Sequence, residues 1–153
     1  MSARTTRRRW RASRYCDAGW GLEMTLEHPR LSEQPCRARR VLVVDDHPSF
    51  RRCARALLAA EGFEVVAEVE DGASAIAAVA ECAPDIVLLD VQLPDLDGFE
   101  VAKRLLTSDP GLRIVLISSR DRSQYGALVE SSGALGFVSK GDLTGAAIER
   151  LLR

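Results

Sequence analysis

From residue 40 onward, five short apolar runs alternate with five longer amphipathic segments, and this alternation restricts the fold more than any other feature. Four of the runs are β-branched or leucine-rich with almost no polar alternation, which is typical of parallel strands covered on both faces. The run at 63–69 is more mixed, and we expect it to lie nearer an edge of the sheet. The expected strands are residues 41–44, 63–69, 86–89, 114–117 and 135–138.

The segments between the runs carry apolar residues at helical spacing. In the first, Phe50, Ala54, Leu57 and Leu58 follow a three-four pattern, and Gly62 marks the end of the helix. Short strand–helix units joined by right-handed crossovers build an open parallel sheet with helices on both faces. The sequence therefore predicts an α/β fold, with helices at 48–61, 72–82, 97–107, 123–132 and 143–152.

The first forty residues differ from the rest of the chain in charge and in patterning. They hold ten arginines against four acidic residues, a net charge of +6, whereas residues 41–153 hold eleven basic against eighteen acidic residues, a net charge of −7. They show neither helical nor strand periodicity. We expect residues 1–40 to form a disordered basic extension, with Met24 as an alternative start of translation, and residues 41–153 to form the folded domain. The alternative is an arm that contacts nucleic acid, with Trp10, Tyr15 and Trp20 stacking on bases.

Several classes of protein are disfavoured by what the sequence lacks. No stretch approaches the ~18 consecutive apolar residues of a membrane helix, and no apolar segment follows the basic run at 7–9 as a signal peptide would require. The four cysteines form no C-x-x-C pair, which disfavours zinc and redox sites. We expect a cytoplasmic protein in which Cys53 and Cys82 are small buried thiols.

Polar residues follow four of the expected strands at their carboxyl ends. Asp45 and Asp46 follow the first strand, Asp90 the third, a Ser-Ser pair at 118–119 ends the fourth, and Lys140 follows the fifth. In open parallel sheets, ligands bind at this edge. Two carboxylates about 5 Å apart repel each other by about 3 kcal/mol at an effective dielectric of ~20, so the site requires a cation. All-oxygen ligands favour Mg²⁺, and Mg²⁺ beside a carboxylate and a lysine suits phosphoryl transfer.

Four segments together resemble the receiver domain of two-component response regulators. They are VLVVDDHP at 41–48, DIVLLDVQLPDLDG at 85–98, IVLISS at 114–119 and GALGFVSK at 133–140. Each segment is moderately specific, and their order and spacing make the resemblance strong over residues 41–153. The first and last segments are most similar to receivers of the NarL/FixJ subfamily. The resemblance implies a flavodoxin-like (βα)5 fold with strand order 2-1-3-4-5.

The resemblance also implies a role for each acidic position. Asp90 matches the phosphoacceptor. Asp46 matches the direct Mg²⁺ ligand, and Asp45 matches the acid that acts largely through water. The backbone carbonyl of Gln92 matches the third protein ligand of the ion.

A second group of positions matches the switch that responds to phosphorylation. Ser118 matches the switch hydroxyl, Ser119 its small neighbour, and Lys140 the lysine that pairs with phosphate. Phe137 matches the aromatic residue that rotates inward on activation. Many receivers have proline after the lysine, whereas this chain has Gly141, a departure that NarL/FixJ-like members commonly share.

The function implied is a phosphorelay module that takes a phosphoryl group from a histidine kinase onto Asp90 and promotes its own phosphorylation and dephosphorylation. Phosphorylation is expected to change the surface of the fourth helix, fifth strand and fifth helix, through which the chain would dimerise or bind an output protein.

The alternatives are a Mg²⁺-dependent phosphatase, which would need an acid where Gln92 stands, and the receiver part of a DNA-binding regulator. A dinucleotide-binding domain is disfavoured because no G-x-G-x-x-G follows the first strand. Because the chain stops after the fifth helix, we expect a stand-alone receiver or one cut from a longer regulator.

Overall fold

The computed structural model describes residues 37–153. Residues 1–36 lie outside the described part. The basic extension predicted for residues 1–40 therefore falls almost entirely outside it. Arg40 is already the first residue of a strand, and its backbone N–H donates to Asp85 Oδ2 at 2.8 Å. In the described part, no helix has the length and apolarity needed to cross a bilayer.

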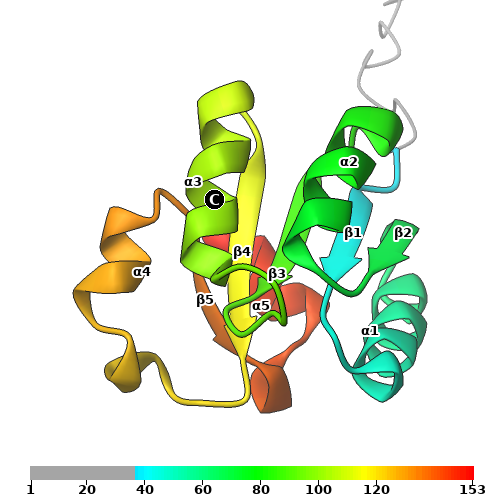
Figure 1. The fold of residues 1–153 in the computed structure, drawn as a ribbon. Coiled ribbons are helices and arrows are strands. Elements are labelled where there is room, and N and C mark those ends of the chain that lie inside the picture. The colour runs from blue at the N-terminus through cyan, green and yellow to red at the C-terminus, as the bar shows by residue number, and fades with distance from the viewer. Residues whose placement is uncertain (1–36) are drawn as a thin grey trace, which may run out of the picture. The chain divides into compact units, whose positions relative to one another are not determined.

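Five parallel strands form one sheet in the order β2-β1-β3-β4-β5, as expected from the sequence. Figure 1 shows this sheet with helices on either side of it. The mixed run forms the edge strand β2, whose residues are exposed or only partly buried. The strands are β1 (Arg40–Val44), β2 (Glu64–Val69), β3 (Ile86–Asp90), β4 (Arg113–Ser118) and β5 (Gly136–Ser139).

The helices follow the predicted order, and two of them differ from the prediction in extent. The segment at 123–132 forms a single 3-10 turn followed by a five-residue helix, because Gly126 between them takes a φ of +44°. The last helix begins later than expected because the Thr144 side chain accepts a hydrogen bond from the Ala147 N–H and caps it. The helices are α1 (Pro48–Ala60), α2 (Gly72–Cys82), α3 (Gly98–Ser108), α4 (Ala127–Ser131) and α5 (Gly145–Leu151), with 3-10 turns η1 (Arg122–Gln124) and η2 (Lys140–Asp142).

Two aliphatic layers cover the sheet. Alternate residues of the central strands point to opposite faces, so that Val43 and Leu88 pack toward α1 and α5, whereas Val44 and Leu89 pack toward α2 and α3. The central strands are almost completely buried, which confirms that they are covered on both faces. With both faces covered, polar chemistry is confined to the strand ends.

The expectation of buried cysteines is wrong for Cys53, which is exposed. The buried stripe of α1 is centred on Ala54 and Leu58, and Cys53 lies one position away from it, which turns its side chain out of the stripe. Cys82, the last residue of α2, is partly buried.

A glycine allows the close approach of α3 to the end of β3. A Cβ atom on Gly98 would collide with the Asp90 carbonyl oxygen and lie 2.8 Å from Val91 Cα. Backbone atoms cannot yield as a flexible side chain can. We therefore expect Gly98→Ala to lower the free energy of unfolding by about 1–3 kcal/mol, measured by urea denaturation.

Gly141→Ala is the matched control, because a Cβ atom there meets no atom within 4 Å and its φ is not positive. We expect this variant to be as stable as the parent or slightly more stable. Equal stability of the two alanine variants would contradict the packing argument at Gly98.

Candidate functional site

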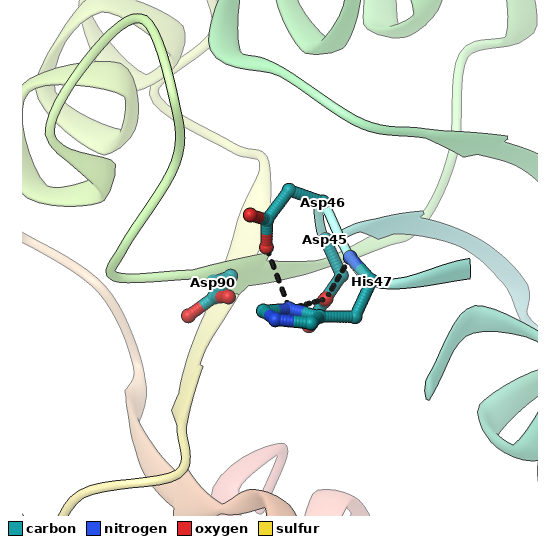
Figure 2. A group of neighbouring side chains, drawn as sticks. All are labelled: Asp45, Asp46, His47 and Asp90. Atoms are coloured by element: carbon teal, nitrogen blue, oxygen red, sulfur yellow. Dashed lines mark hydrogen bonds and ion pairs between the residues drawn. The ribbon is translucent and has the colours of Figure 1, made fainter. Parts of the chain in front are cut away.

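The carboxyl ends of β1 and β3 and the start of η2 bring three acidic side chains and one lysine together. The Asp45 and Asp90 side chains are 0% and 3% exposed, and that of Lys140 is 11% exposed. The Asp46 side chain lies nearer the surface, at 37% exposed. Figure 2 shows Asp45, Asp46 and His47 on the turn after β1, with Asp90 beside them. The structure therefore places the predicted carboxylates and Lys140 in one site.

Lys140 bridges the two buried carboxylates. Its Nζ lies 2.8 Å from Asp90 Oδ2 and 2.5 Å from Asp45 Oδ2, and 4.8 Å from the centroid of the Phe50 ring. Burial opposes the charge on the ammonium, but the contacts with Asp45 and Asp90 outweigh it and raise the pKa of Lys140. Lys140 is therefore a fixed positive charge in the site at neutral pH.

The surroundings of Asp90 have opposing effects on its pKa. Burial raises the pKa of Asp90, and the nearby Asp45 charge adds to this rise, whereas the hydrogen bonds from Lys140 and from the Gln92 N–H (3.1 Å to Oδ1) oppose it. Burial has the largest effect, so the pKa of Asp90 lies above its ordinary value. A raised pKa makes the carboxylate oxygens more basic than those of an exposed aspartate, which favours nucleophilic attack.

The turn after β1 is held by its own polar groups. Asp45 Oδ1 accepts from the His47 N–H at 2.8 Å, and the Arg51 guanidinium donates to the Asp45 carbonyl at 2.6 Å. His47 Nδ1 lies 2.7 Å from Asp46 Oδ1. No role for His47 was predicted from the sequence, although its place directly after the two aspartates was an available signal.

These residues fit a divalent cation. Ligand atoms of Asp45, Asp46, His47 and Asp90 all lie within 4.8 Å of one another. Asp45 Oδ2 and Asp46 Oδ1 are buried without a well-formed hydrogen bond, and their contacts are the ion pairs with Lys140 and His47. Carboxylate oxygens gathered in one place are the donors that Mg²⁺ prefers. Gln92 lies on the adjoining loop, and the role of its carbonyl as a ligand stays a prediction.

Ser118, at the end of β4, is fully buried and faces an unexpected partner. Its Oγ lies 2.9 Å from Tyr125 Oη and accepts from the Arg120 N–H at 3.1 Å. Ser119 is exposed, and Phe137 is partly buried with its ring 5.7 Å from that of Tyr125. Tyr125 was not predictable as a partner of Ser118, because its segment has the pattern of a continuous helix and no motif links the two residues.

The loop after Asp90 is fixed to the start of α2 by Asp95, which the sequence analysis did not single out. The Asp95 carboxylate accepts from the Gly72 N–H at 2.8 Å and the Ala73 N–H at 3.0 Å. The bond from Gly72 is the main cause that lowers the pKa of Asp95 below its ordinary value of 3.8. Asp97 accepts from the Phe99 N–H at 2.8 Å and caps α3. The half of the loop nearer α3, after Gln92, is therefore anchored at Asp95 and Asp97.

Comparison with known proteins gives a family match and close relatives. Residues 41–149 match the family model described as response regulator receiver domain. The chain is 39% identical over 101 residues to BvgA of Bordetella pertussis, described as a transcription regulator of virulence factors; the match covers 66% of this chain and 48% of BvgA. It is 34% identical over 103 residues to the response regulator GacA of Pseudomonas aeruginosa, covering 67% of this chain and 48% of GacA.

Solved structures show the same likeness. A LuxR-family two-component response regulator from Aurantimonas sp. SI85-9A1 superimposes with a TM-score of 0.68 at 31% identity. The match covers 75% of this chain and 86% of that one. By contrast, this chain spans about half the length of the curated relatives BvgA and GacA.

The anchor at Asp95 predicts a dependence of stability on pH. Because the pKa of Asp95 is lowered in the folded chain, its contribution is present above pH 3.8 and is lost as the pH falls through the folded value. We expect Asp95→Asn to lower the urea midpoint at neutral pH, and the difference from the parent to shrink as the pH falls below 3.8.

Asp121→Asn is the control, because the exposed Asp121 side chain accepts no hydrogen bond within residues 37–153. Its midpoint should follow that of the parent at every pH. A difference between Asp95→Asn and the parent that stays constant with pH would show that the charge of Asp95 is not what holds the loop.

Proposed function

We propose that this chain, which belongs to the family of response regulator receiver domains, takes a phosphoryl group from a histidine kinase onto the Asp90 carboxylate. The observation that carries the proposal is the buried contact of Asp90 Oδ2 with Lys140 Nζ at 2.8 Å, at the strand end where Asp45 and Asp46 also lie. Phosphoryl transfer to an aspartate requires a carboxylate and an ammonium side by side, next to a cation site. This site has both groups beside a candidate cation site.

The chemistry assigns each group one task. An Asp90 oxygen attacks the phosphorus of a phosphohistidine, a P–O bond forms as the P–N bond breaks, and the histidine side chain leaves as the product. The Lys140 ammonium, already 2.8 Å from Asp90, faces the transferred group and offsets its charge. Burial of Asp90 limits access of water to the acyl phosphate.

Asp46, Asp45, Asp90 and the backbone carbonyl of Gln92 would hold Mg²⁺, and the bound ion would neutralise charge on the phosphoryl oxygens. Asp46 is better placed than Asp45 for direct ligation. Both oxygens of Asp45 are already engaged, Oδ1 by the His47 N–H and Oδ2 by Lys140. Within residues 37–153, the one ion pair of the Asp46 carboxylate is with His47, through a single oxygen, and its side chain is more exposed.

The output of the domain is proposed to be the surface formed by α4, β5 and α5, within residues 121–153. Leu128 of α4 and Leu135, directly before β5, are large apolar residues that are 52% and 44% exposed. The relatives named as transcription regulators are about twice as long as the matched segment, which supports an output domain or a partner protein. Alternatively, the same surface would form a homodimer. We place the protein in the cytoplasm, where DNA and kinase domains are accessible.

The first test of this function is chemical modification of Asp90. Incubation with acetyl phosphate and Mg²⁺ should add ~80 Da to the full chain, seen by intact-mass spectrometry, and Asp90→Asn should abolish the addition. The fold should persist, because the amide replaces the carboxylate at nearly the same volume. Asp109→Asn, which changes an exposed aspartate after α3, should be modified as the parent is. Full modification of Asp90→Asn would refute the assignment, and steady hydrolysis of a small phosphomonoester by the parent would indicate a phosphatase.

The second prediction concerns the cation. Asp46→Asn should weaken Mg²⁺ binding by at least about tenfold, equivalent to about 1.4 kcal/mol, and Asp45→Asn should weaken it less. Isothermal titration calorimetry on the full chain measures both. Ser49→Ala, an exposed change in the first turn of α1, should leave the affinity unchanged. Unchanged affinity in Asp46→Asn, or a larger loss in Asp45→Asn, would show that the direct ligand has been misassigned.

A further inference from the structure

The proton of the Ser118 hydroxyl has one acceptor within the described part of the chain. Ser118 is fully buried, and its Oγ already accepts the Arg120 N–H at 3.1 Å. The other hydrogen-bonding atom near it is Tyr125 Oη, at 2.9 Å. A buried hydroxyl that donates to nothing is costly, whereas the partly exposed Tyr125 can donate its own proton to water. Ser118 is therefore the donor and Tyr125 the acceptor.

We propose that Tyr125 is a positioning residue of the phosphoryl switch, because its hydroxyl competes with a phosphoryl oxygen for the single proton of Ser118. The inference rests on the proposed function of Asp90. Ile117 of β4 is paired with Asp90 of β3, and Ser118 directly follows Ile117. Asp90 and Ser118 therefore both lie at the carboxyl ends of adjacent strands. When Ser118 donates to a phosphoryl oxygen on Asp90, Tyr125 loses that hydrogen bond.

The position of Tyr125 connects this loss to the output surface. Its ring packs edge-on against Phe99 of α3, with centroids 5.6 Å apart, and tilted against Phe137 of β5, with centroids 5.7 Å apart. Tyr125 directly precedes Gly126, whose φ of +44° breaks the chain direction before α4. A change at the Tyr125 hydroxyl thus reaches α4 through the backbone and β5 through ring contact. Tyr125 therefore stands between Ser118 and Phe137 in the switch.

A spectroscopic experiment tests the hydrogen bond directly. The full chain has two tyrosines, Tyr15 and Tyr125, so labelling tyrosine with ¹³C at Cζ gives two resonances that Tyr125→Phe assigns. We expect Ser118→Ala to shift the Tyr125 resonance without phosphorylation. Acetyl phosphate with Mg²⁺ should shift it in the same direction in the parent, in samples whose adduct is confirmed by mass. An adduct on Asp90 with an unmoved Tyr125 resonance would overturn the inference and leave the proposed function intact.

A second measurement uses the competition itself. Removing the competing hydroxyl in Tyr125→Phe should raise the steady-state ratio of phosphorylated to unphosphorylated chain about two- to tenfold, the effect of one net hydrogen bond. Ser131→Ala is the matched control, because it removes a hydroxyl that bonds the Leu128 carbonyl within the same helix and does not touch Ser118. It should leave both the ratio and the Tyr125 resonance unchanged.

The outcomes separate the two proposals. An unchanged or lower ratio in Tyr125→Phe would show that its hydroxyl does not compete for the Ser118 proton and would overturn the inference. An equal rise in Ser131→Ala would overturn it too, because the effect would then come from the stability of α4. Absence of any adduct in the parent would instead overturn the proposed function of Asp90, and the inference with it. Thermal unfolding of each variant confirms that the chains compared are folded.

Discussion

Three carboxylates share one edge of the sheet, and the rest of the site depends on how their mutual repulsion is offset. Asp45 and Asp90 are both almost completely buried, where an unpaired charge is costly. Lys140 provides one positive charge to the two of them, which leaves the site short of positive charge once Asp46 is counted. The remaining negative charge is what makes the site a candidate for a divalent cation, and a cation held there with open coordination positions would also bind phosphate oxygens. The same imbalance therefore accounts for the cation and for the proposed substrate.

The loops around the site keep these charges together. The turn after β1 is held by bonds from the His47 N–H and the Arg51 guanidinium, and the loop after β3 by Asp95 on the start of α2. Gly98 lets α3 begin against the backbone of Asp90. Because the groups that would bind the cation are fixed before it arrives, little ordering has to accompany binding. These hydrogen bonds and this close packing lie on the β1 and β3 side of the site.

Much of this was predictable from the sequence, because the signals are local. Buried parallel strands require continuous apolar runs, so strand positions follow from composition over a few residues, and polar residues at strand ends must meet at one edge of the sheet. Cys53 was placed wrongly because a one-position shift around a helix separates buried from exposed. Tyr125 and Asp95 were missed because their roles depend on contacts with Ser118 and Gly72, and no periodic pattern encodes such pairs. The break at Gly126 was masked by apolar residues that fit helical spacing on either side.

The β4–α4 side of the site is built differently, and this difference explains why a single proton could act there. A five-residue helix is far too short to be stable alone, and Val129 is its one buried residue. Its position therefore depends on tertiary contacts. Tyr125, two residues before the helix, packs its ring against Phe99 and Phe137 and bonds Ser118 through its hydroxyl. One net hydrogen bond is worth about 0.5–1.5 kcal/mol, which is negligible against the fully buried strands but comparable with what holds so short a helix. A chemical change at the buried Asp90 is thus well suited to transmission through a segment as short as α4, where small energies select between conformations.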